Sequence, residues 1–244
     1  MLVIDDTSFP KQGKASVGVA RQYCGALGKR ANCQVVVSAE YLADEPESSR
    51  PLHWPVSGRL YLPEGWANDR ERREISHVPQ EISFRIKPNI ALSLVDLSRE
   101  WEVPFEVVVA DSGYGKYPSF LGGYSTLGAE LSLERLASVA KSRWAIEQFY
   151  EDGKGECGLS DYQGRRWEGL HRHLALSMLA YSFLMLHSSI TTSVGGSSSS
   201  GDAFFPLGQA HDASCDPQAG TGVAFGGPGA MVHQNREDQD LPSS

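Results

Sequence analysis

The sequence FEVVVADSG, at residues 105–113, contains a short apolar run that ends in a carboxylate and a turn. A run of β-branched residues bounded by Asp-Ser-Gly is typical of a strand that is buried on both faces. A second run of this kind, LVIDD at residues 2–6, also ends in acidic residues. If the two strands are parallel neighbours, Asp6 and Asp111 leave the same edge of one sheet and their carboxylates converge. For either aspartate alone, a hydrogen bond to the backbone of the following turn is the simpler explanation.

The surrounding sequence supplies the other elements of a layered domain. Apolar patterning predicts further strands at 33–41 and 58–62, and helices at 90–101, 131–154 and 167–187. Three strands, a helix, a strand and further helices indicate an α/β fold.

The net charge of −8, from 22 basic and 30 acidic residues, is unfavourable for a nucleic-acid-binding protein, but it is unevenly distributed. Residues 190–244 are rich in Gly, Ser and Pro and hold six acids and one base, so we predict a disordered C-terminal tail outside a domain at 1–189. From Thr7 to Ala39 there is no acid, and the five basic residues are Lys11, Lys14, Arg21, Lys29 and Arg30. This segment predicts a local basic surface, with an ordinary solvated segment as the alternative.

Other classes of protein are excluded by simple patterns. The longest apolar run, residues 174–186, has thirteen residues, whereas a membrane-spanning helix needs about 20. The N-terminus lacks the pattern of a signal peptide, so we expect a cytoplasmic location and no membrane contact. Four cysteines without a C-x-x-C pair argue against a structural zinc site and a disulfide framework.

The predicted helix around KSRWAIEQFYEDGKGE, residues 141–156, places charges of alternating sign on one face. Arg143, Glu147 and Lys154 lie within about 40° of one another at 3.6 residues per turn. A surface ion pair is the common alternative, but this helix is too apolar to be wholly solvated.

Two aspartates and a glutamate together suggest a metal site. Asp6, Asp111 and Glu147 offer the hard oxygen ligands that Mg²⁺ or Mn²⁺ prefers. Such ions support in-line displacement at phosphorus, and neighbouring Arg and Lys side chains hold the phosphate by charge-assisted hydrogen bonds. The chemistry predicted is therefore phosphoryl transfer.

Three blocks of the chain resemble the DDE transposases of bacterial insertion sequences, in particular the seven-oh-one group. They are VIDDTSFPKQGKASVGVARQYCGALGKRANCQVVVS at 3–38, VVVADSGYG at 107–115, and the block from SRWAIEQF to AYSFL at 142–184. The resemblance implies an RNase H-like mixed sheet flanked by helices. It also implies Mg²⁺ or Mn²⁺ as cofactor, transposon ends and target DNA as partners, a homodimer on DNA, and association with the nucleoid.

Carried over by motif, the resemblance implies catalytic and metal-binding roles for Asp6, chosen over the adjacent Asp5, and for Asp111 and Glu147. Ala140 stands where the family signature has a tyrosine. The DNA-binding residues expected from the basic segment and the family blocks are Lys11, Lys14, Arg21, Arg143, Lys154 and Arg165.

The chain also departs from the family. Glu147 comes only 36 positions after Asp111, where these transposases carry a β-rich insertion domain, and the chain begins at the first core strand. We therefore expect a shortened catalytic core that cuts and joins DNA. Two alternatives are an inactive remnant that only binds DNA, and another metal-dependent nuclease on the same type of fold.

Overall fold

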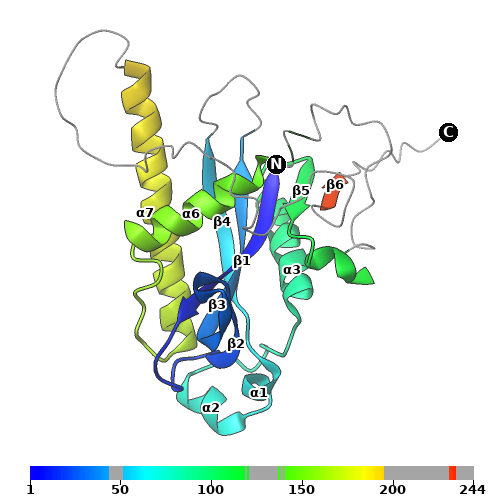
Figure 1. The fold of residues 1–244 in the computed structure, drawn as a ribbon, viewed down its shortest axis with the longest axis vertical. Helices are drawn as coiled ribbons and strands as arrows, with labels where there is room; N and C mark the ends of the chain where they lie inside the picture. Colours follow the sequence, from blue (N-terminus) through cyan, green and yellow to red (C-terminus); the bar gives the residue numbers. More distant parts are fainter. Residues whose placement is uncertain are drawn as a thin grey trace.

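A mixed β-sheet with helices on both faces forms the centre of the molecule (Figure 1). The computed structural model describes residues 1–43, 52–118, 120, 137, 139, 141–194 and 231–234. Within them, the sheet has six strands in the order β2-β3-β1-β5-β6, with β4 also paired to β3. Their bounds are β1 Leu2–Pro10, β2 Ala20–Cys24, β3 Lys29–Leu42, β4 His53–Leu60, β5 Val107–Ala110 and β6 Met231–Gln234.

The helices described are α1 Glu64–Ala67, α2 Arg70–Ile75, α3 Lys87–Glu100, α6 Arg143–Gly155 and α7 Trp167–Val194, with 3-10 turns η1 Gly25–Leu27 and η2 Tyr114–Lys116. None of these helices is sufficiently long and apolar to cross a bilayer. The predicted α/β fold, a mixed sheet flanked by helices, is confirmed.

The two apolar runs that contain or precede the aspartates form neighbouring parallel strands, which is the condition under which the sequence brings their carboxylates together. β1 pairs in parallel with β5, with Ile4 beside Ala110, and antiparallel with β3, with Asp5 opposite Ser38. The β1–β5 pairing ends at Ile4 and Ala110, so Asp5, within β1, and Asp111, just after β5, come next to each other, while β1 itself continues to Pro10.

Burial divides the residues of β1 between two cores. Val3 packs with the cluster under α6 and α7, which includes Ile146 and Leu174. Leu2 and Ile4 pack with the cluster under α3. Because side chains alternate along a strand, the next two residues of β1 also project to opposite faces.

Local chemistry explains several of the element ends. Pro88 lies in the first turn of α3, where its missing N–H costs nothing. The Asp69 side chain accepts a hydrogen bond of 3.0 Å from the backbone N–H of Arg72 and caps α2. Gly28 ends η1 with φ of 60°, a left-handed conformation that glycine adopts without strain.

The C-terminal part differs from the sequence-based expectation. α7 runs through the predicted domain boundary at residue 189 to Val194, and residues 231–234, within the predicted disordered tail, pair with β5 as strand β6. The other residues of that tail, the first part of the helix predicted at 131–154 and Ala140 lie outside the described residues.

Candidate active site

The guanidinium of Arg143, the first residue of α6, lies among three carboxylates. Its Nη2 is 3.3 Å from Oδ2 of Asp5 and 3.9 Å from Oε1 of Glu147, and its Nη1 is 3.2 Å from Oδ2 of Asp111. One cation thus holds three acids that come from three separate elements of the fold.

The fold explains why these three acids meet. Asp5 and Asp111 each follow the last residues of the β1–β5 register, Ile4 and Ala110, so they lie side by side. α6 covers this face of the sheet through its buried apolar side chains, and its first turns carry Arg143 and Glu147 four residues apart. Burying each large apolar side chain of α6 contributes about 1.5–3 kcal/mol, which fixes the helix against the sheet.

The three acids differ in depth. The side chain of Asp5 is 17% exposed, that of Asp111 is 40% exposed and that of Glu147 is 66% exposed. Burial raises the pKa of Asp5 to about 7, and the nearby Arg143 guanidinium only partly offsets this effect. The three acids therefore form a gradient from the desolvated carboxylate of Asp5 to the solvated one of Glu147.

Beneath the site, a buried hydrogen bond ties α6 to the sheet. The hydroxyl groups of Ser38 and Tyr150 are 2.7 Å apart. Ser38 is the register partner of Asp5 in β3, so this bond lies directly beside the deepest acid. The sequence alone does not indicate this pair, since only the register of β1 on β3 brings Ser38 to this position.

Asp6 does not join the three acids. It projects to the opposite face of β1, where its two carboxylate oxygens are 3.0 and 3.1 Å from Nζ of Lys87. The hydroxyl of Tyr114 donates a further hydrogen bond of 3.4 Å to Asp6. The structure thus brings Asp5, rather than the Asp6 selected from the sequence, to Asp111 and Glu147, because successive residues of a strand face opposite sides of the sheet.

The basic residues expected at a DNA surface are in different environments. Lys11 is buried and donates to the backbone carbonyl of Tyr162, and burial lowers its pKa. Lys154 is partly buried, with Nζ 5.9 Å from the ring centroid of Phe9, and burial lowers its pKa as well.

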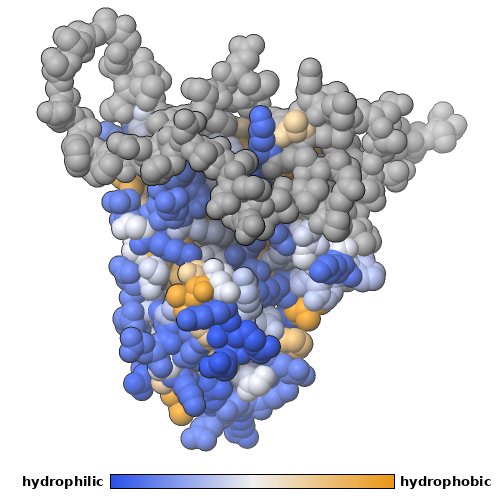
Figure 2. Space-filling view, in the orientation of Figure 1, coloured by the Kyte–Doolittle hydropathy of each residue, from blue (hydrophilic) through white to orange (hydrophobic). Residues whose placement is uncertain are grey.

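Three of the other expected DNA contacts, Lys14, Arg21 and Arg165, are exposed. Figure 2 shows one face of the molecule. Below the grey atoms its surface is mostly hydrophilic, with hydrophobic residues only in small separate groups. Arg143, the remaining expected contact, is held by the acids described above.

The three acids that contact Arg143 have the chemistry of a divalent-metal site. Among the residues that the structure describes, no three His, Cys, Asp or Glu side chains are close enough to hold one metal ion together. The donors of Asp5, Asp111 and Glu147 are all hard oxygens, and a cationic group already lies where they converge. This donor set fits Mg²⁺ or Mn²⁺.

The sequence profile of the family described as DDE superfamily endonuclease matches residues 1–145, which is more than half of the chain. The chain belongs to the DDE superfamily endonucleases. The matched region of this endonuclease-family chain contains Asp5, Asp6, Asp111 and Arg143, and it ends two residues before Glu147.

A relative among known proteins is the probable transposase for insertion sequence element IS701 of Microchaete diplosiphon. It is 31% identical over 116 residues, which cover 48% of this chain and 26% of that protein. The aligned part thus spans about a quarter of the relative. No solved structure matches the chain. The resemblance to DDE transposases of insertion sequences is confirmed.

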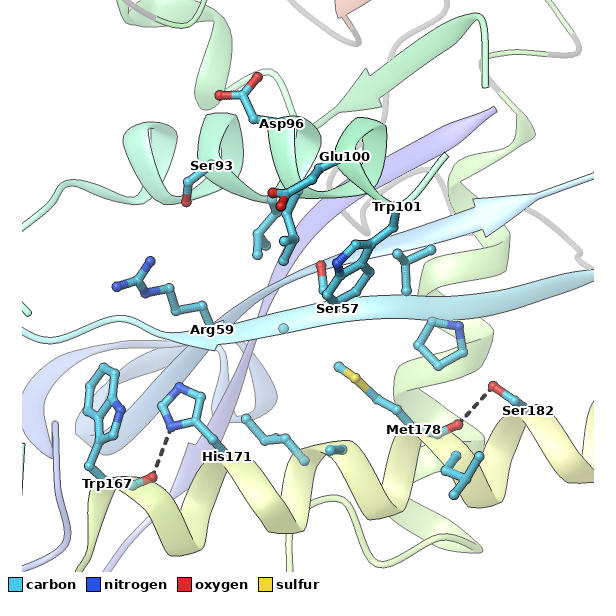
Figure 3. A pocket seen from close by; sticks show the side chains of 18 of the residues that line it. Ser57, Arg59, Ser93, Asp96, Glu100, Trp101, Trp167, His171, Met178 and Ser182 are labelled. Carbon is cyan, nitrogen blue, oxygen red and sulfur yellow. Dashed lines mark hydrogen bonds between the residues drawn. The ribbon is translucent and has the colours of Figure 1, made fainter. Parts of the chain in front are cut away.

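A hollow of about 760 Å³ lies elsewhere, between β4, α3 and α7 (Figure 3). Its labelled side chains include Arg59 from β4, Trp101 at the end of α3 and His171 from α7. Neither Arg143 nor any of the three acids that it holds lines this hollow. The candidate active site is therefore separate from it.

Proposed function

We propose that this chain is the catalytic core of an insertion-sequence transposase, in which Asp5, Asp111 and Glu147 hold the metal for cleavage and joining of DNA. The observation that carries the proposal is the convergence of these three carboxylates on one cationic group, beside the point where the pairing of β1 with β5 ends. Membership of the endonuclease family supports a nuclease reaction. We propose strand transfer in addition to it.

Asp5 is the ligand that gains most from a divalent ion. Its pKa of about 7 means that a substantial fraction of the carboxyl is protonated at neutral pH. A nearby dication favours the charged form and restores the ligand, because opposite charges lower the pKa of an acid. The depth of Asp5 also holds its oxygens in place, whereas the exposed Glu147 is free to adjust.

When bound, Mg²⁺ or Mn²⁺ supplies an activated oxygen nucleophile and stabilises the leaving oxygen in an in-line displacement at phosphorus. Arg143 balances the charge of the acids in the chain as described. Its planar array of N–H donors also matches a phosphate, so it is suited to hold the DNA backbone at the site.

DNA binding is the second part of the proposal. The exposed side chains of Lys14, Arg21 and Arg165 are available for phosphate contacts, which fix the position of a duplex without reading its sequence. Lys11 and Lys154 contribute less, because burial and local contacts already occupy them. We further propose that the protein acts as a homodimer on DNA at the nucleoid.

Nicking of a supercoiled plasmid in Mn²⁺ tests the proposed reaction. We expect the wild type to nick the plasmid, EDTA to stop it, and Asp5→Asn and Glu147→Gln to reduce it to background. Glu151→Gln is the matched control, since Glu151 is an exposed glutamate one turn further along α6. Equal nicking by the wild type and Glu147→Gln would reject the proposed site.

The same proteins discriminate the alternatives. Salt-dependent DNA binding by both wild type and Glu147→Gln, with no cleavage by either, would identify a DNA-binding remnant. Joining of a 3′-hydroxyl end to target DNA separates a transposase core from a metal-dependent nuclease that only hydrolyses.

A further inference from the structure

The carboxylate of Asp6 is held by two groups on the face of the sheet opposite the candidate site. Nζ of Lys87 lies within 3.1 Å of both of its oxygens, and the hydroxyl of Tyr114 donates to Oδ2 at 3.4 Å. Lys87 begins α3, and Tyr114 begins η2. Asp6 thus links its own strand, β1, to α3 and to η2.

Tyr114 connects this network to an acid of the site. Its backbone N–H donates to the carbonyl of Asp111 at 3.0 Å, and the N–H of Gly113 donates to Oδ1 of Asp111 at 2.7 Å. The turn that carries Asp111 is therefore closed on itself, and the tyrosine ring is its anchor in the core. That ring is buried and packs against Phe120, with 5.5 Å between the ring centroids.

The other end of the network is equally fixed. Asp6 follows Asp5 in β1, and its backbone position is set by the pairing with β3, where it lies opposite Val37. A hydrogen bond from Tyr114 to Asp6 therefore ties the turn of Asp111 to the strand of Asp5, through the back of the sheet.

Lys87 has a distinct part in this arrangement. Asp5 and Asp6 are adjacent on β1, and their side chains lie on opposite faces of the sheet, where each has a cation beside it. The ammonium of Lys87 pairs with Asp6 on its own face of the sheet and offsets the charge of that carboxylate. Asp6 can then act as a hydrogen-bond acceptor without adding a net charge behind the site.

We infer that Asp6 is a positioning residue, which fixes the spacing between Asp5 and Asp111 by accepting the hydrogen bond of Tyr114 while Lys87 neutralises it. This inference rests on the proposed function for its catalytic consequence. The two neighbouring aspartates then have different roles. Asp5 faces the site, and Asp6 fixes the geometry of the site from the opposite face of the sheet.

The first test is metal affinity, measured without DNA by electron paramagnetic resonance of free Mn²⁺. We expect Asp6→Asn and Tyr114→Phe each to weaken Mn²⁺ binding by roughly 10-fold, as for other residues that orient metal ligands. The double variant is expected to bind Mn²⁺ no more weakly than the weaker-binding single variant, because both substitutions remove the same hydrogen bond. Tyr117→Phe is the matched control, since Tyr117 lies at the end of the same turn and is 41% exposed.

Nicking at saturating Mn²⁺ then separates a positioning residue from a ligand. We expect Asp6→Asn and Tyr114→Phe to recover most of the wild-type rate at high Mn²⁺, whereas Asp5→Asn does not recover. If Asp6→Asn abolishes Mn²⁺ binding as fully as Asp5→Asn while Tyr114→Phe binds like the wild type, Asp6 is a ligand and the inference is overturned.

Hydrogen exchange of the backbone amides at residues 112–115 gives a readout that does not depend on metal. Both Asp6→Asn and Tyr114→Phe should accelerate exchange in this turn by a similar factor, and Tyr117→Phe should leave it unchanged. Unchanged exchange in the first two variants would overturn the inference even if the protein cuts DNA. If exchange is accelerated in the two variants but the wild type does not bind Mn²⁺, the link between Tyr114 and Asp6 stands and the proposed metal site is rejected.

Discussion

Replacement of Asp5 by asparagine is expected to stabilise the protein at alkaline pH when no divalent metal is present. The folded-state pKa of Asp5, about 7, lies above its ordinary value of 3.8 because the carboxyl is desolvated. An acid with a raised folded-state pKa favours folding below its unfolded pKa, and this contribution is lost as the pH rises towards the folded pKa. Between these two pKa values, the free energy of unfolding of the wild type falls by about 1.36 kcal/mol per pH unit, which amounts to at most about 4 kcal/mol.

Urea denaturation in EDTA at pH 4 and pH 8 measures this effect. We expect Asp5→Asn and the wild type to have similar free energies of unfolding at pH 4. At pH 8 the variant should be more stable by up to about 4 kcal/mol, or on the order of 10 °C in Tm. Added Mn²⁺ should stabilise the wild type at pH 8 and leave the variant unchanged.

Asp6→Asn is the control for this measurement, because it removes the neighbouring carboxylate but leaves Asp5 in place. It should retain the fall in stability between pH 4 and pH 8. Parallel pH profiles for Asp5→Asn and the wild type would refute the reasoning, since they would show that Asp5 ionises as easily in the folded chain as in the unfolded one.

Three further substitutions, one of them with a matched control, probe packing under α6 and at a turn before β2, each by urea denaturation at one pH. Phe149→Ala removes a fully buried ring of α6 and should cost about 3–5 kcal/mol, and a loss below 1 kcal/mol would contradict the packing. Tyr150→Phe leaves the buried hydroxyl of Ser38 without its partner and should cost about 1–3 kcal/mol, whereas an unchanged midpoint would show that water replaces the bond. Gly18→Ala should cost at least 1 kcal/mol because φ is 72° and the new Cβ would meet Leu60 at 2.9 Å, while Gly13→Ala, with open space around it, should be close to neutral.

The central strands were predictable because their signal is local. The β-branched runs of β1 and β5 both form strands at the expected places. β5 ends before the turn of Asp111, whereas β1 continues past its expected end at Asp6 to Pro10, because it pairs with β3 along its whole length. β2 was missed because ARQYC has no continuous apolar run, and its pairing with β3 creates the strand. β6 was missed for a related reason, since four residues in a Gly-rich stretch pair only because the edge of β5 accepts them.

The site was predictable in its residue types and only partly in its positions. Asp111, Glu147 and Arg143 follow from motif and helical spacing. The choice between Asp5 and Asp6 did not, because both faces of β1 are buried and alternation alone does not say which face α6 covers. That choice requires the packing of elements that are more than 100 residues apart in the chain.

The position of Lys11 shows a second limit. Its charge and its place in an acid-free segment predict a surface contact with DNA. In the folded chain, the segment around Tyr162 covers it, and its ammonium binds a carbonyl there. Charge along a sequence predicts where cations are, but burial by a distant segment decides which of them remain available.

Because Arg143 and Glu147 lie on one helix, α6 brings both of them to the candidate site, or removes both of them from it, in one movement. Detachment of α6 from the sheet removes an acid and the guanidinium in a single event, and leaves Asp5 and Asp111 facing each other with no counter-charge. Their repulsion then opposes the β1–β5 pairing that holds them. Docking of α6 and closure of the parallel strand pair therefore stabilise each other.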